Sequence, residues 1–112
     1  MGYRFAGDAL QFPGRELLSH GILPGTIQLP PDGQPVIQLN DANTCGGYPK
    51  LGVVIAADMP RLAQLRLGAG LRFEEVGRAE ALAAADRLRA LCEKLPGRIA
   101  LAADYARRRG LE

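Results

Sequence analysis

Glycine and proline divide residues 1–77 into short segments, and this punctuation limits the possible folds more than any other feature of the chain. Proline cannot donate a backbone hydrogen bond inside a helix, and glycine favours turns, so long helices are disfavoured in this part. Short segments between frequent turns are typical of a β-sandwich or β-barrel. From Arg78 the sequence becomes rich in alanine and leucine. We therefore expect a mainly β domain over residues 1–77 and a C-terminal helical extension over residues 78–112.

A hairpin is the clearest local element. Apolar and polar residues alternate over residues 25–29 and again over residues 35–39, as they do in half-buried strands. Between them lies "PPDGQ", in which Pro31 presets φ for a turn and Gly33 can supply a positive φ. The pattern predicts two antiparallel strands joined at this turn.

Three further segments are expected to form strands. "MGYRF" would place Tyr3 and Phe5 on one face of a strand. The apolar run at residues 51–57, "LGVVIAA", is typical of a central strand that is buried on both faces. "LRFEEV" at residues 71–76 would be the last strand, with its apolar residues facing inward.

Two kinds of helix signal follow. Asp58 as an N-cap with Pro60 in the first turn predicts a short helix. Residues 78–95 carry apolar residues at spacings of three and four, as expected for one face of a helix that packs on a core. Pro96 followed by glycine should stop this helix, and residues 98–110 would then form a second one. The chain therefore has one or two C-terminal helices.

Composition excludes some function classes. The chain has 14 basic and 12 acidic side chains, a net charge of +2 and no tryptophan, which does not fit a nucleic-acid-binding surface. The apolar run of residues 51–57 is too short to span a bilayer. Cys45 and Cys92 lack metal-ligand spacing and read as reduced thiols of a cytoplasmic protein, without a metal. The first residues lack a leader, and the final "LE" resembles a vector remnant, so a fragment of a longer protein is one expectation.

The segment "LNDANTCGGYPKLGVV", residues 39–54, is the main candidate site. Gly46 and Gly47 allow the backbone to approach a ligand and to direct N–H groups at an oxyanion. Tyr48 can donate a hydrogen bond, Lys50 offers a cation to a carboxylate or phosphate, and Asp41 can accept a proton. The alternative is an ordinary loop in which the glycines serve only the turn.

Other reactive side chains give weaker signals. Cys45 has no histidine within its segment, and His20 next to Ser19 does not make a credible triad. Both residues are more simply interpreted as structural. The arginines at residues 107–109 are typical of a solvated helix end, and the leucine and alanine stripe before them is typical of core packing. A helix-in-groove contact with a partner is the minority interpretation.

Several motifs in fixed order resemble one family. "GTIQ", "PPDGQP", "GGYPK" and "ADMPRLAQL" are similar to the C-terminal part of the allophanate hydrolase subunit 2 family of biotin-dependent carboxyltransferase-type domains. That family includes the 5-oxoprolinase C subunit, a sporulation-kinase anti-inhibitor and part of urea amidolyase. The resemblance implies a cyclophilin-like β-barrel, possible here only in incomplete form, with the loop at the mouth of a substrate cleft. The matching positions imply catalytic Asp41, Tyr48 and Lys50, and substrate-binding Gln28, Thr44, Gly46 and Gly47.

Two departures from the family pattern stand out. Cys45 replaces a usual second threonine, and "RLGAG" replaces a usual proline-glycine-aspartate turn. The first removes a hydroxyl donor from the candidate site, whereas the second affects the last hairpin. The family's N-terminal portion has no counterpart in this sequence.

The resemblance also implies a function. The first expectation is part of an ATP-dependent hydrolase that opens 5-oxoproline to glutamate, acting with a homologous B-like subunit and a hydrolytic A-like subunit, and inactive without them. ATP would be bound together with one of these partners. One alternative is carboxyl transfer from carboxybiotin to urea or a similar amide, which ranks lower because no biotin-carrier signature is present. Another alternative is a non-catalytic module that antagonises a kinase inhibitor, and a homo-oligomer is also left open.

Overall fold

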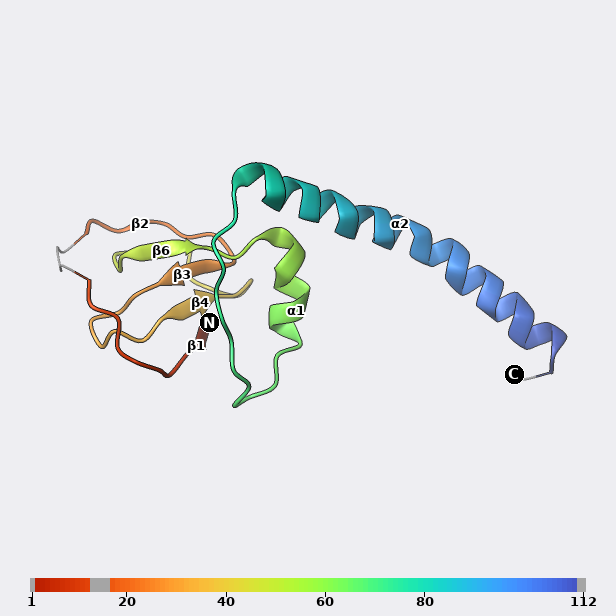
Figure 1. Cartoon of the computed structure of the whole chain (residues 1–112), viewed down its shortest axis with the longest axis horizontal. Coiled ribbons are helices and arrows are strands. Elements are labelled where there is room, and N and C mark those ends of the chain that lie inside the picture. Colours follow the sequence, from red (N-terminus) through yellow and green to blue (C-terminus); the bar gives the residue numbers. More distant parts are fainter. Residues whose placement is uncertain (1, 13–16, 111–112) are drawn as a thin grey trace. The chain divides into compact units, whose positions relative to one another are not determined.

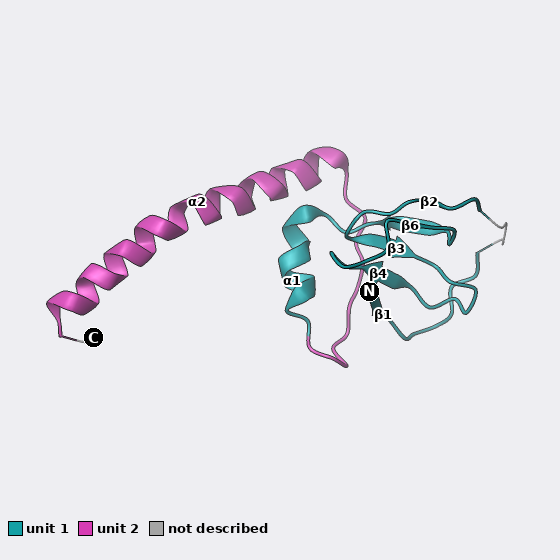
Figure 2. Ribbon diagram, turned by 180° about the vertical axis from the view of Figure 1, so that it is seen from behind, with its two compact units in different colours: residues 1–65 teal, residues 66–112 magenta. Residues whose placement is uncertain are grey.

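The chain forms two compact units. A computed structural model describes residues 2–12 and 17–110. Figure 2 shows the two units in different colours: Met1–Leu65 contains all the described strands, and Arg66–Glu112 contains the long C-terminal helix. The domain boundary predicted at residue 77 stays a prediction.

Unit 1 is built on a four-stranded antiparallel sheet with the strand order β1-β4-β3-β6 (Figure 1). Its strands are β1 (Gly2–Arg4), β3 (Thr26–Gln28), β4 (Val36–Gln38) and β6 (Lys50–Val53). A separate two-stranded ribbon pairs β2 (His20–Gly21) with β5 (Cys45–Gly46). In the described residues the sheets do not close into a barrel, so the mainly β character of this unit is confirmed and the cyclophilin-like barrel is not.

The predicted hairpin is confirmed. Strands β3 and β4 pair antiparallel, with Ile27 opposite Ile37. The turn between them closes with a hydrogen bond of 3.0 Å from the Gly33 N–H to the Pro30 carbonyl. Gly33 has a φ of 73°, which only glycine adopts without strain. The sequence signal and the structure agree because the positive φ of Gly33 and its bond to Pro30 both lie within the turn.

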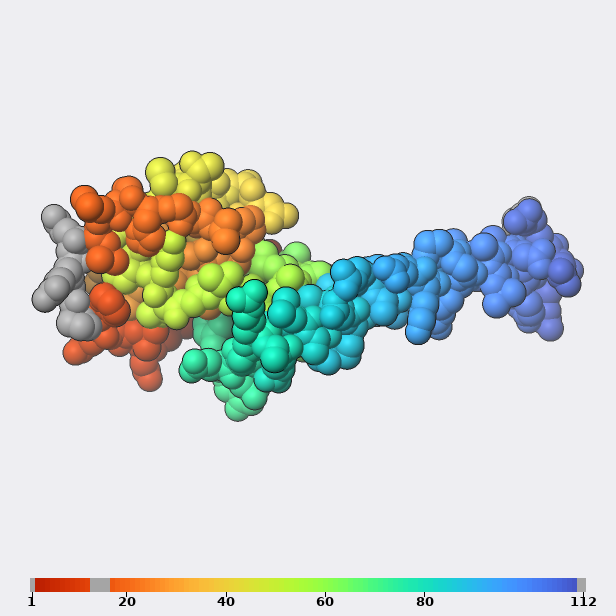
Figure 3. Space-filling model, turned by 90° about the horizontal axis from the view of Figure 1, so that it is seen from above, coloured from red at the N-terminus to blue at the C-terminus, as the bar shows by residue number. Residues whose placement is uncertain are grey.

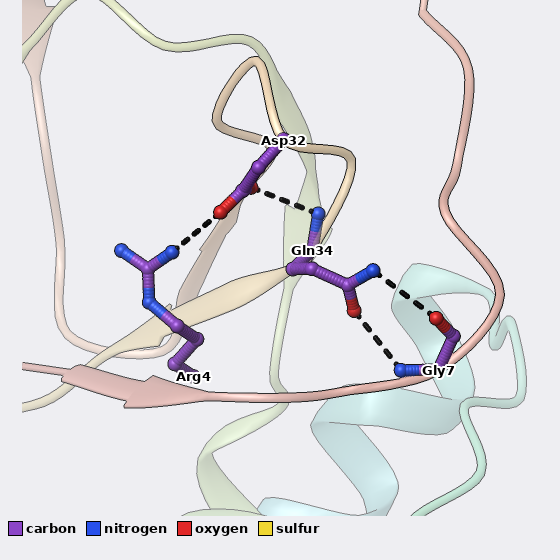
Figure 4. Close-up of polar contacts among 4 residues, drawn as sticks. All are labelled: Arg4, Gly7, Asp32 and Gln34. Carbon is purple, nitrogen blue, oxygen red and sulfur yellow. Dashed lines mark hydrogen bonds and ion pairs between the residues drawn. The ribbon is translucent and has the colours of Figure 1, made fainter.

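The same turn also holds the chain that follows β1 (Figure 4). The Gln34 side chain accepts a hydrogen bond from the Gly7 N–H at 3.0 Å and donates one to the Gly7 carbonyl at 3.1 Å. Asp32 accepts from the Gln34 N–H at 3.1 Å and from the Arg4 guanidinium at 2.6 Å. The Gln34 side chain therefore accepts and donates hydrogen bonds as a backbone residue of a neighbouring strand would, and it connects Gly7 to the β3–β4 turn.

A small apolar core lies between the sheet and α1 (Met59–Ala63). Its buried members are Ile27, Ile37 and Leu62, and partly buried side chains surround them: Tyr3, Phe5, Leu39, Val54, Met59 and Leu65. Because Tyr3 and Phe5 both contact this core, the predicted amphipathic strand at the start of the chain is confirmed.

The helix start predicted at Asp58 is confirmed in position. A short 3-10 turn, η1 (Ala56–Asp58), leads into α1, for which Asp58 is the N-cap residue and a proline lies in the first turn. The expected capping bond is absent from this described segment. The Asp58 carboxylate instead accepts a hydrogen bond from the Arg61 guanidinium at 3.3 Å.

The prediction of a buried central strand at residues 51–57 is wrong. Strand β6 ends at Val53, and all four of its residues are exposed. It lies at the edge of the sheet and pairs only with β3 in the part of the chain that the structure describes. An apolar run indicates burial only when other chain elements cover both of its faces, and here they do not.

Two predictions for the C-terminal part are also wrong. Residues 71–76 form no strand in the described structure, because an alternating pattern needs a partner edge to become one. Helix α2 (Arg78–Arg108) continues through Pro96 instead of stopping there. Strong helix formers on both sides of Pro96 offset the hydrogen bond that proline removes.

Helix α2 is amphipathic but buries none of its residues, all of which the structure describes. The helix is the turquoise-to-blue segment of Figure 3. Apolar side chains are exposed along its length, which contradicts the expected core packing: Leu82, Leu91, Leu95, Ile99, Leu101 and Tyr105. Local contacts occur near its C-terminal end, including an ion pair of Arg108 with Asp104 at 2.9 Å. Among the described helices, none combines the length and apolar character needed to cross a membrane.

Candidate functional site

The two faces of the four-stranded sheet differ in chemistry. Ile27 and Ile37 pack toward α1, and because side chains alternate along a strand, Thr26, Gln28 and Gln38 point to the opposite face. This second face is polar, yet Thr26 is only 2% exposed and Gln28 only 4%. We call it the polar face; a polar surface this enclosed needs internal partners.

The β2–β5 ribbon covers the Gln28 end of the polar face. A Cβ atom added to Gly46 would lie 3.0 Å from Gln28 Nε2 and 2.8 Å from Ile22 Cδ1. The ribbon extends beyond its paired residues through a hydrogen bond of 2.9 Å from the Ile22 N–H to the Thr44 carbonyl. The backbone of Gly46 thus rests directly on the Gln28 amide.

Gly46 and Gly47 are required by space and not by a positive φ. At Gly47 a Cβ atom would lie 2.9 Å from the Leu17 carbonyl oxygen. The sequence predicted that the glycines permit a close approach, and the structure shows such an approach within the chain itself. A Cβ atom at Gly47 would force the Leu17 backbone to move, whereas a Cβ atom at Gly46 would displace the ends of the Ile22 and Gln28 side chains.

Lys50 joins the sheet to the ribbon. It is the register partner of Gln28, because a bulge between Ile27 and Gln28 moves Leu51 out of the pairing. The Lys50 ammonium donates a hydrogen bond to the carbonyl of Gly21 in β2. Lys50 thus lies opposite Gln28 in the neighbouring strand, and its exposed side chain connects β6 to β2.

Gln38 is part of the polar face, although the sequence motifs did not point to it. Its Nε2 donates a hydrogen bond of 2.7 Å to Gln28 Oε1. Gln28 Nε2, at the other end of the same amide, is buried and has no hydrogen-bond partner among the described residues. The signal that could have found Gln38 is its position on the same face of the predicted hairpin as Gln28.

The remaining predicted site residues lie on the exposed side of the loop. Asp41, Thr44 and Tyr48 all have exposed side chains, and Tyr48 is 48% exposed. The structure thus brings Gln28, Gly46 and Lys50 near one another. All the predicted roles stay predictions: catalysis by Asp41, Tyr48 and Lys50, and substrate binding by Gln28, Thr44, Gly46 and Gly47.

A thiol–imidazole pair does not form in the ribbon. His20 lies opposite Gly46, and Cys45 lies opposite Gly21, so consecutive pairs place the two side chains on opposite faces. His20 Nδ1 lies 2.9 Å from the Leu18 carbonyl oxygen. The described residues also contain no group of three histidine, cysteine or acidic side chains that could hold a metal ion.

Comparisons with known proteins agree on one family. Residues 1–75 match the family described as carboxyltransferase domain, subdomain A and B. The chain is 46% identical to the 5-oxoprolinase C subunit of Escherichia coli over 100 residues, which is 88% of this chain and 32% of that protein. It is 52% identical to the 5-oxoprolinase C subunit of Haemophilus influenzae over 82 residues, 72% of this chain and 26% of that protein. The chain thus spans about a third or less of these relatives.

Proposed function

The chain belongs to the family of carboxyltransferase domains, subdomain A and B, and from this premise we propose that it is part of a 5-oxoprolinase subunit. Two relatives that carry the name of the 5-oxoprolinase C subunit, at 46% and 52% identity, support this role. The observation that carries the proposal is that the motifs "GTIQ" and "GGYPK", which supply Gln28 and the pair Gly46 and Lys50, meet at one polar face. The family predicted from the sequence motifs is confirmed, whereas the activity is a proposal.

The groups at this face suit a small molecule that carries acceptor oxygens. 5-Oxoproline has a carboxylate and a lactam carbonyl, and its ring opening generates negative charge on the carbonyl oxygen. Lys50 and the backbone N–H groups of Gly46 and Gly47 would hold the carboxylate or the developing anion. Lys50 would exchange the Gly21 carbonyl for the ligand, and partial exclusion of water would strengthen the new contact.

Three exposed residues complete the proposed site. Tyr48 would donate a hydrogen bond to the carbonyl oxygen, and Asp41 would act as a base or position one. Thr44 would contact the substrate beside the ribbon. Its place next to the ribbon is fixed by its backbone carbonyl, which accepts a hydrogen bond from the Ile22 N–H.

Partner proteins supply the remaining chemistry in this proposal. A homologous B-like subunit and a hydrolytic A-like subunit would act with this chain, and ATP would be bound together with one of them. The exposed edge strand β6 supports a further proposal, that the sheet is one part of a cyclophilin-like barrel completed by other segments of a longer protein. The residues of the polar face recognise oxygen atoms, and no step through ATP or biotin is assigned to them.

A chimera tests the proposal. The matching third of the Escherichia coli protein would be replaced by this chain, and 5-oxoproline-dependent ATP consumption measured with the other subunits present. We expect activity, and we expect Lys50→Ala to lower kcat/KM by about 10- to 100-fold, the range for loss of a charged hydrogen bond. Tyr48→Phe should lower it by a smaller factor, because the ring is retained.

Matched controls come from helix α2. Lys94→Ala and Tyr105→Phe make the same chemical changes at residues outside the polar face and should leave turnover unchanged. If the two sets of variants behave alike, or if Lys50→Ala lowers the melting temperature as much as it lowers turnover, the loop is structural only.

Carboxyl transfer is the second candidate because the matched family is described as a carboxyltransferase domain. Turnover of urea that depends on carboxybiotin, without 5-oxoproline-dependent ATP consumption, would favour it. Tight association with the partner proteins without any turnover would favour the non-catalytic module.

A further inference from the structure

The amides of Gln28 and Gln38 form a directed pair on the polar face. Gln28 lies opposite Val36 in the β3–β4 ladder, so Gln38 lies two residues further along β4 on the same face. A long side chain spans such a diagonal, and Gln38 Nε2 reaches Gln28 Oε1 at 2.7 Å.

A glutamine amide has an acceptor at one end and two donors at the other. With Oε1 directed at Gln38, the NH2 end of Gln28 is turned toward the backbone of Gly46. This nitrogen is buried and has no hydrogen-bond partner in the described part of the chain. Buried donors without partners are rare in folded proteins because each costs free energy.

The neighbour decides which end of the amide faces Gly46. If residue 38 donates, Gln28 must present its oxygen to residue 38 and its N–H groups to Gly46. If residue 38 could only accept, Gln28 would turn over and present an acceptor to Gly46 instead. Gln38 itself carries both a donor and an acceptor; in the described structure it donates, which leaves the N–H groups of Gln28 facing Gly46.

We propose that Gln38 is a positioning residue that orients the Gln28 amide, so that Gln28 donates a hydrogen bond to a carbonyl or carboxylate oxygen of a small ligand bound beside Gly46. The inference deepens the proposed function and rests on it only for the identity of the ligand. The ligand class follows from the unpaired donor at Gln28 and from the Lys50 cation on the same face. The Thr26 hydroxyl on the same face accepts a hydrogen bond from the Leu23 N–H at 3.2 Å.

The covering ribbon must move for a ligand to reach Gln28, because Gly46 lies against the Gln28 amide. Strands β2 and β5 contribute only two register pairs, and a two-stranded ribbon this short is marginally stable by itself. Movement of Gly46 and of the Ile22 side chain away from Gln28 would open a place for a ligand oxygen within hydrogen-bond distance of Gln28 Nε2.

Two variants with long polar side chains reverse or retain the polarity. Gln38→Glu presents only acceptors when ionised, whereas Gln38→Lys presents only donors. NMR on the full chain labelled with 15N would follow the side-chain amide signals of Gln28. Contacts from these protons to the Gly46 α-protons report the orientation without a ligand, and 2-pyrrolidinone serves as a neutral probe that carries a lactam carbonyl.

We expect the contacts to Gly46 in the native chain and in Gln38→Lys, and their loss in Gln38→Glu. We also expect 2-pyrrolidinone to shift the Gln28 amide signals in the first two, with its affinity at least about tenfold lower in Gln38→Glu. The neutral probe matters because the charges of the variants would themselves attract or repel a carboxylate. A merely structural role would make both variants behave alike, with changes that follow their melting temperatures.

Three results would overturn the inference: absent contacts between Gln28 and Gly46 in the native chain, equal effects of the two variants, or amide signals that neither 2-pyrrolidinone nor 5-oxoproline moves. If 2-pyrrolidinone shifts the signals but 5-oxoproline does not and the chimera is inactive, the inference stands and the proposed function fails. If the chimera is active while both probes leave Gln28 unmoved, the proposed function stands and the inference fails.

Discussion

The β unit, Met1–Leu65, and helix α2 differ in what their apolar residues contact. In the β unit, residues distant in the chain bury one another, as Ile27, Ile37 and Leu62 do. In α2 no residue is buried across its described length, and its side-chain contacts are local, such as Arg108 with Asp104. A helix can form from neighbouring residues alone, whereas a polar face with a cover needs contacts between distant segments.

That difference explains where the candidate site lies. Gln28, Gly46 and Lys50 acquire their arrangement only when strands β3, β5 and β6 are brought together. Helix α2 presents exposed side chains in a row, but in the described structure it brings together no comparable group of buried polar atoms. The comparison therefore favours the β unit as the place of the proposed chemistry.

The largest expected effect is the difference in stability loss between replacing a buried isoleucine and replacing an exposed one. Ile37 is fully buried, and Ile37→Ala should lower the free energy of unfolding by about 2–5 kcal/mol. Ile99 in α2 is 65% exposed, and Ile99→Ala should change it by less than about 0.5 kcal/mol. Urea denaturation of both variants makes the measurement, and equal losses would contradict the contrast between the two regions.

Pro96→Ala gives the next largest effect. Proline inside a helix is about 3 kcal/mol less favourable than alanine, so replacing it should stabilise α2 locally and raise the circular dichroism signal at 222 nm. The unfolding midpoint of the β unit, followed by NMR through the backbone amide signals of β3 and β4, should not move. A shift of that midpoint would show that the two regions are coupled.

Gly46→Ala should have a smaller effect on stability. The added Cβ would meet Gln28 Nε2 at 3.0 Å and Ile22 Cδ1 at 2.8 Å, and crowding of this kind costs about 1–3 kcal/mol. Gly21→Ala is the control in the same ribbon, because a Cβ there meets nothing within 4 Å. Thermal denaturation should separate the two variants, and similar melting temperatures would show that the ribbon does not press on the polar face.

Local chemistry made part of this fold predictable. The hairpin follows from Pro31 and Gly33, and the start of α1 follows from Asp58 with the proline after it. The edge position of β6 was not predictable, because an apolar run does not reveal what covers it. The continuation of α2 through Pro96 was missed because a stop signal was weighed without the strong helix formers around it.

The site was predictable as a set of residues but not as an arrangement. Motif resemblance selected Gln28, Gly46 and Lys50, which the structure places together. The bulge that sets Lys50 opposite Gln28 has no clear sequence signal. Gln38 was missed because the motif comparison did not ask which residues share a face with Gln28.

Hydrogen exchange of the full chain with and without 5-oxoproline tests the central claim most directly, since that claim places the ligand on the polar face beneath the β2–β5 ribbon. The account predicts slower exchange on ligand addition in the segments around residues 20–28 and 44–50, and no change in α2. Slower exchange confined to α2, or no change anywhere at a ligand concentration that supports turnover of the chimera, would contradict it.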